Sequence, residues 1–159
     1  MKTRNLIIIS FFLVLFSLDL ASADENITIQ NAWIREAPPT IKIMAAYLQI
    51  ENLSDKALTL ISAESPEFER IEFHLSQIED GVARMQQQNE IIIAANTIFS
   101  FEPGGYHLML FNNIAPMREG ELASIKLTFA NGETLMFDAM VKRSDSTEMH
   151  NHNHHEHSK

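Results

Sequence analysis

The sequence contains no cysteine among its 159 residues. Disulfide bonds, dithiol redox chemistry and metal sites that need a thiolate, such as the usual blue-copper centre, are therefore excluded. Common catalytic motifs are missing as well: there is no His-Glu-x-x-His segment, no Gly-x-Ser-x-Gly elbow and no phosphate-binding glycine loop. We therefore expect a protein that is not an enzyme.

Basic residues are also few. Twelve Lys and Arg residues face 21 Asp and Glu residues, which gives a formal net charge of −9. Such an acidic chain is a poor partner for nucleic acid or for anionic lipid, because both carry the same sign of charge. The charge favours solubility and the attraction of cations.

The single long apolar run lies at the beginning of the chain. Lys2 and Arg4 precede the apolar stretch from Leu6 to Leu18, and Ala21-Ser22-Ala23 has the small residues of a cleavage site. The stretch is short for a transmembrane helix, and no cysteine follows it for a lipid anchor. We predict a signal peptide at residues 1–23 and a mature protein that is exported, periplasmic, monomeric and not stably inserted in a membrane.

The rest of the chain, up to residue 141, has the pattern of short strands. Runs of β-branched and aromatic residues alternate with polar ones, and turn signals rich in Gly, Pro, Asn and Asp separate them. No long segment has a helical period. The pattern predicts one domain at residues 24–141 that is an all-β, antiparallel sandwich or barrel. The expected strands are Ile27–Arg35, Ile43–Glu51, Ala57–Ile61, Arg70–Gln77, Val82–Gln86, Thr97–Phe101, Tyr106–Phe111, Ala123–Phe129 and Glu133–Val141.

A hairpin is expected at Asp80-Gly81, which is the strongest two-residue turn signal in the sequence. A turn at these residues would place His74 opposite Gln87 on the neighbouring strand. Met85 would then lie diagonal to His74 on the same face. Such diagonal backbones are roughly 7–8 Å apart, so His and Met side chains can share a metal between them.

A second segment carries the same two residue types. In the expected strand that begins at Tyr106, His107 and Met109 alternate with apolar residues and therefore face one side, while Leu108 faces the other. Thioether sulfur is a soft, uncharged ligand that suits copper(I) and is poor for magnesium, calcium or manganese. The residues predicted to bind one copper(I) ion are His74, Met85, His107 and Met109.

These four positions carry a family resemblance. Their spacing, with His107 and Met109 inside the sequence PGGYHLML, is similar to the H-x10-M-x21-H-x-M motif of the periplasmic copper(I) chaperones called PCuAC. The similarity extends to AWIREAPP at Ala32–Pro39 and AAYLQIEN at Ala45–Asn52, and covers roughly residues 32–141. The resemblance implies a cupredoxin-like Greek-key β-sandwich.

The chain departs from the family in one respect. Many PCuAC proteins carry an additional Met shortly after the first His, where this sequence has Leu75 and Ser76. Other methionines have no motif context, and packing or surface roles are favoured for them. Met44 is the most plausible additional ligand among these four, which are Met44, Met117, Met136 and Met140.

After Val141 the alternating pattern stops, and residues 142–159 are polar. This tail has too little apolar surface to offset the entropy of ordering, so we expect it to be disordered without a ligand. Clustered imidazoles bind copper(II) strongly, which predicts an auxiliary copper(II) site. A terminus without a role and an engineered tag are the alternatives. The tail histidines are His150, His152, His154, His155 and His157.

The sequence is therefore interpreted as that of a periplasmic copper metallochaperone. The family resemblance implies delivery of copper to the CuA centre of cytochrome c oxidase, with a Sco-type thiol protein as a further partner. Two alternatives remain at this point. One is a copper buffer or resistance protein without a dedicated acceptor, and the other is an enzyme that uses copper held at the tail.

Overall fold

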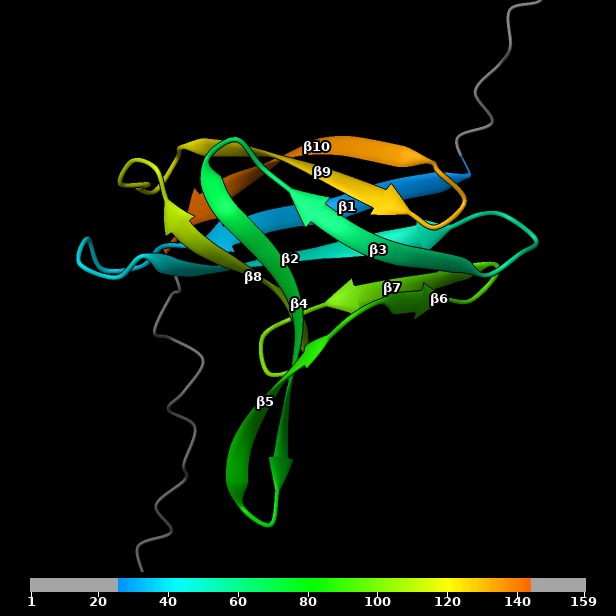
Figure 1. Cartoon of the computed structure of the whole chain (residues 1–159), viewed down its shortest axis with the longest axis horizontal. Helices are drawn as coiled ribbons and strands as arrows, with labels where there is room; N and C mark the ends of the chain where they lie inside the picture. The colour runs from blue at the N-terminus through cyan, green and yellow to red at the C-terminus, as the bar shows by residue number, and fades with distance from the viewer. Residues whose placement is uncertain (1–25, 144–159) are drawn as a thin grey trace, which may run out of the picture.

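The computed structural model describes residues 26–143, and the expected signal peptide and histidine-rich tail lie outside these residues. The described part consists of strands and loops (Figure 1). It contains no helix of the length and apolar character that crossing a membrane requires. The strands are β1 (Ile27–Arg35), β2 (Ile43–Asn52), β3 (Leu58–Glu64), β4 (Phe68–Glu79), β5 (Val82–Gln88), β6 (Ile91–Ile93), β7 (Thr97–Phe101), β8 (Tyr106–Asn113), β9 (Leu122–Phe129) and β10 (Thr134–Lys142).

The strands pair in the order β5-β4-β8-β2-β1-β10-β9-β3-β6, and β7 pairs with β2 beside β8. This order folds back on itself into a sandwich, since β3 near one end of it contacts β4 near the other (Figure 1). All pairs within residues 26–143 are antiparallel except β1 with β10. The all-β class and the cupredoxin-like sandwich predicted from the sequence are thus confirmed, with one parallel pair that makes the sheet mixed.

Alternation of apolar and polar residues explains why these segments are strands. In β9, Ala123, Ile125, Leu127 and Phe129 are at most 1% exposed, whereas the residues between them are half-buried. A period of two places these four side chains on the inner face of the sheet. Similar inward residues from the other strands complete one continuous apolar core.

The nine expected strands are all present, with ends that differ by up to three residues. The structure has one further strand, β6, which was not predicted. It consists of Ile91, Ile92 and Ile93 and pairs with β3 through three residues. A run of three apolar residues is too short to display a period, so only its pairing identifies it as a strand.

The β4–β5 hairpin projects from the body of the sandwich (Figure 1). Its turn residues Asp80 and Gly81 both have positive φ angles, 53° and 76°, which is the conformation of a type I′ turn. The resulting register places His74 opposite Gln87, as predicted. Most of β5 is exposed, so this arm is held to the body chiefly through β4.

The buried face of β9 provides a test of where the stability of the domain resides. Leu127→Ala should lower the free energy of unfolding by about 2–5 kcal/mol, because it leaves a cavity in the core. Leu122→Ala on the same strand removes a side chain that is 53% exposed and should cost less than about 0.5 kcal/mol. Urea unfolding of metal-free protein measures both changes. Equal losses, or a parent chain that is unfolded without metal, would contradict a core that is independent of metal.

Candidate metal centre

The predicted ligands lie on one face of the three neighbouring strands β5, β4 and β8. His74 of β4 is directly opposite His107 of β8, and Met109 is opposite Glu72 one step along the same pair. Met85 of β5 is opposite Ser76, which places it diagonal to His74. Residues that face each other across a ladder project to the same side of the sheet, so the structure brings all four to one surface.

The His107 side chain is buried, with 6% of the residue exposed. Its Nδ1 lies 3.2 Å from the carbonyl oxygen of Gly105. A carbonyl oxygen only accepts, so Nδ1 donates the hydrogen and Nε2 keeps a lone pair that can bind a metal. Burial lowers the pKa of His107, and the nearby His74 and Arg35 lower it further, against the Gly105 hydrogen bond. The neutral, ligating form is favoured.

His74 is also largely buried, and its ring centroid lies 5.8 Å from that of His107. Its Nε2 is 2.8 Å from Oε2 of Glu72. Its Nδ1 is buried and has no hydrogen-bond partner within residues 26–143. Each histidine therefore has one nitrogen engaged with an oxygen of the protein and one that is not.

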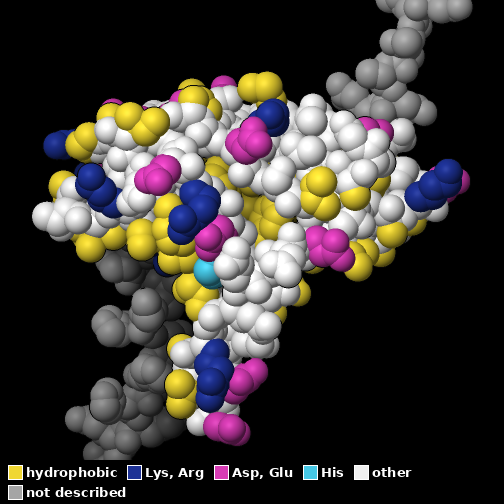
Figure 2. All heavy atoms as spheres, viewed as in Figure 1, with side chains coloured by type: hydrophobic (Ala, Val, Ile, Leu, Met, Phe, Trp, Pro, Cys, Tyr) yellow, Lys and Arg dark blue, Asp and Glu magenta, His cyan; other side chains and the backbone are white. Residues whose placement is uncertain are grey.

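The two methionines differ in exposure. Met109 is half-buried, whereas Met85 on the hairpin is 55% exposed. Both line an open pocket of about 310 Å³ together with His107 and Arg35. His74 does not line this pocket and lies beside it, next to His107. Figure 2 shows histidine atoms at the surface where the projecting hairpin meets the sandwich, with hydrophobic atoms on one side and acidic atoms on another.

Two residues near the site were not predicted as functional. Arg35 lines the pocket, and its guanidinium carbon lies 5.3 Å from the ring centroid of Tyr47. Glu72 contacts His74 through the hydrogen bond described above. Glu72 precedes His74 by two residues, so the strand period alone was a sufficient signal for it. Arg35 reaches the site only through the pairing of β1 with β2, which the sequence does not reveal.

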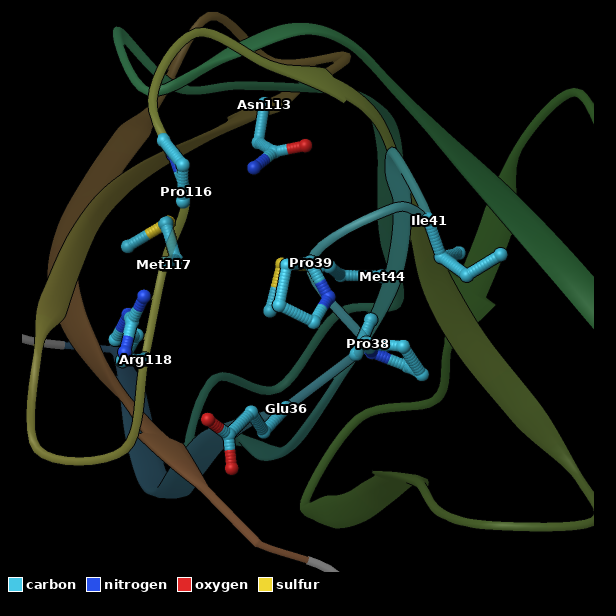
Figure 3. Close-up of a pocket in the computed structure, with 10 residues that line it drawn as sticks. Glu36, Pro38, Pro39, Ile41, Met44, Asn113, Pro116, Met117 and Arg118 are labelled. Atoms are coloured by element: carbon cyan, nitrogen blue, oxygen red, sulfur yellow. The ribbon is translucent and has the colours of Figure 1, made fainter.

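The remaining methionines lie away from the four predicted ligands or beneath them. Met136 and Met140 are exposed at the surface of β10. Met44 is 4% exposed and pairs with Leu110, so it lies on the opposite strand face from Met109 and its partner Ala45. Met44 and Met117 line a small cavity of about 70 Å³ together with Pro38 and Pro39 (Figure 3). Met44 thus packs into the core between this cavity and the open pocket.

Two of the four predicted ligands on this face are thioethers, which are soft ligands. Within the described residues, no three His, Cys, Asp or Glu side chains come together as a metal cluster. The thioether sulfurs of Met85 and Met109 on this face suit copper(I) better than zinc, magnesium or calcium. The buried Nδ1 of His74, which has no hydrogen-bond partner within the described residues, is a further nitrogen that could bind a metal.

Comparison with known sequences identifies related proteins of undefined role. A family model described as "Putative lipoprotein LpqE-like" matches residues 27–141. A putative lipoprotein of Leifsonia xyli subsp. xyli is 25% identical over 119 residues, which cover 74% of this chain and 70% of that protein. An uncharacterized protein of Rickettsia prowazekii is 26% identical over 118 residues, 70% of this chain and 64% of the relative.

Comparison with solved structures identifies copper-binding domains. Copper(I)-bound DR1885 from Deinococcus radiodurans is 28% identical, with a TM-score of 0.57, over 72% of this chain and 76% of that one. Its apo form is 25% identical, with a TM-score of 0.60, over 91% and 97%. The copper-bound PCuAC domain from PmoF2 has a TM-score of 0.64 at 22% identity, over 75% and 94%. The predicted resemblance to PCuAC proteins is thereby confirmed.

Proposed function

Since the chain belongs to the LpqE-like family and is related to PCuAC proteins, we propose that it is a copper metallochaperone. Its cargo is one copper(I) ion, held by His74, Met85, His107 and Met109. The observation that carries the proposal is the placement of two imidazoles and two thioethers on one face of β5, β4 and β8. Related domains with the same fold are copper-bound, which supports the choice of metal.

The exposure of the ligands suits a protein that passes its cargo on. The imidazoles are largely buried between two paired strands, while the Met85 thioether is more than half exposed on the projecting hairpin. An incoming ligand from a partner therefore meets Met85 first and exchanges with it while the histidines still hold the ion. No thiolate has to be displaced, so release does not require breaking a strong sulfur–copper bond.

Export and the recipient extend the proposal further. The family description and the Leifsonia relative name lipoproteins, which are exported, and this supports an exported protein here. We place the mature chain in the periplasm as a monomer. The proposed recipient is the CuA centre of cytochrome c oxidase, reached directly or through a Sco-type thiol protein, and this step rests on analogy with the family.

The ligand set is tested by anaerobic copper(I) titration against a competing chelator. Met109→Leu conserves shape but removes a sulfur, and His107→Ala removes an imidazole. Loss of a residue that only hydrogen-bonds to a metal ligand weakens metal binding about 10–100-fold. Each of these variants removes a proposed ligand itself and should therefore weaken copper(I) binding by at least that factor. Met136→Leu, at an exposed methionine of β10, is the matched control and should bind as the parent does. Parent-like affinity in both site variants would refute the site.

Transfer separates the chaperone from a copper buffer. The copper(I)-loaded protein, mixed anaerobically with the apo form of a CuA domain, should lose its copper at a rate that rises with acceptor concentration. The reason is that the exposed Met85 permits direct exchange between the two sites. Size-separated metal analysis measures the result. Copper that leaves only at the rate seen with a chelator of equal affinity would favour the buffer.

The histidines that follow residue 149 make a separate proposal, which rests on the sequence alone. Imidazoles without thioether or thiolate favour copper(II), so truncation before Met149 should abolish most copper(II) binding and leave copper(I) binding nearly unchanged. Calorimetry with each oxidation state measures both. Loss of copper(I) binding as well would mean that the tail supplies ligands to the main site, and retained copper(II) binding would leave the tail without a metal role.

A further inference from the structure

Glu72 occupies the centre of a short chain of contacts that ends at His74. Its Oε1 lies 2.7 Å from Nε of Arg70, and its Oε2 lies 2.8 Å from Nε2 of His74. The Glu72 side chain is 17% exposed and that of His74 is 12% exposed, so solvent competes weakly for the bond between them, whereas the Arg70 side chain is 55% exposed. The Arg70 guanidinium is itself held over the ring of Phe111, at 4.2 Å from the ring centroid.

This arrangement selects one form of the neutral imidazole. An ionised carboxylate only accepts hydrogen bonds, so the His74 nitrogen that faces it must carry the hydrogen. Nε2 is that nitrogen, and the lone pair then lies on Nδ1. In the opposite tautomer, the Nε2 lone pair would face the negative oxygen of Glu72. The buried Nδ1 lacks a donor within the described residues, and it is the atom left available to a metal.

We propose that Glu72 is a positioning residue that holds His74 with its hydrogen on Nε2 and so presents Nδ1 to copper(I). The inference rests on the proposed function, because it assumes that His74 is a ligand. The two histidines then bind through different nitrogens: His74 through Nδ1, set by Glu72, and His107 through Nε2, set by the carbonyl of Gly105. An oxygen acceptor behind each ring fixes its orientation and raises its basicity as a ligand.

Glu72 is better placed for this role than for direct ligation. Both of its oxygens are engaged, one by Arg70 and one by His74. Copper(I) is also a soft ion, for which a carboxylate is a poor ligand beside thioether and imidazole. Arg70 in turn keeps the carboxylate pointed at the ring, so the chain Arg70–Glu72–His74 runs from the surface to the proposed metal site.

The tautomers can be read in the metal-free protein by long-range ¹H–¹⁵N NMR of the imidazoles at about pH 8, where histidine is neutral. In the parent, His74 should show its hydrogen on Nε2 and His107 should show it on Nδ1. Glu72→Gln conserves size but supplies an amide that can donate to Nε2, so His74 should populate the opposite tautomer. Copper(I) affinity should fall about 10–100-fold in this variant.

Glu69→Gln is the matched control, since Glu69 lies on the same strand and accepts a hydrogen bond from Asn112 at 2.7 Å. It should change neither the His74 tautomer nor copper(I) affinity. The inference is overturned if His74 of the parent carries its hydrogen on Nδ1, a reading that needs no variant and does not depend on folding of a mutant. It is also overturned if Glu72→Gln binds copper(I) as the parent does. Failure of the proposed function is separate, because it would appear as parent-like binding in both His107→Ala and Met109→Leu.

Discussion

The antiparallel pairing of β4 with β8 is the constraint on which the rest of the site depends. It places His74 opposite His107 and Glu72 opposite Met109, so both imidazoles, one thioether and the carboxylate share a face. A slip of β4 by one residue would turn His74 and Glu72 to the opposite face from His107 and Met109. The core prevents such a slip, because Phe73 and Leu108, which are opposite each other in the same ladder, are 4% and 0% exposed. The buried apolar side chains thus fix the register that places the predicted ligands on one face.

Along β8, alternate residues pack into the core and face the pocket. In β8, Leu108 and Leu110 pack into the core while His107 and Met109 face the pocket. The His107 imidazole is therefore backed by the buried core of the domain. Met85 is different, because β5 is an edge strand whose residues are largely exposed and whose support comes from β4. The proposed site thus has two largely buried imidazoles on one side and an exposed thioether on the other.

Much of the site was predictable because it depends on local rules. The type I′ turn at Asp80-Gly81 fixes the β4–β5 register, and the period of two in β8 fixes the direction of His107 and Met109. The pairing of β4 with β8 is long-range, so the sequence suggested convergence without supplying the direct opposition of His74 and His107. Arg35 enters through β1, and Met44 lines the floor of the pocket although its strand face points into the core. Such facts follow from strand order, which residue patterns leave undetermined.

The pocket is lined by a positive residue, Arg35, although the chain as a whole is negative. The sequence has a net charge of −9, which attracts cations toward the protein from a distance. At the pocket itself, burial is the main cause that lowers the pKa of His107, and the nearby His74 and the Arg35 guanidinium, which packs against Tyr47, lower it further. The acidic net charge attracts cations toward the protein, while burial, more than any neighbouring charge, lowers the pKa of His107 and favours its neutral imidazole. A carboxylate in the place of Arg35 would attract the copper ion, which the Arg35 cation repels, but it would also stabilise the protonated imidazole of His107, which has no free lone pair for a metal.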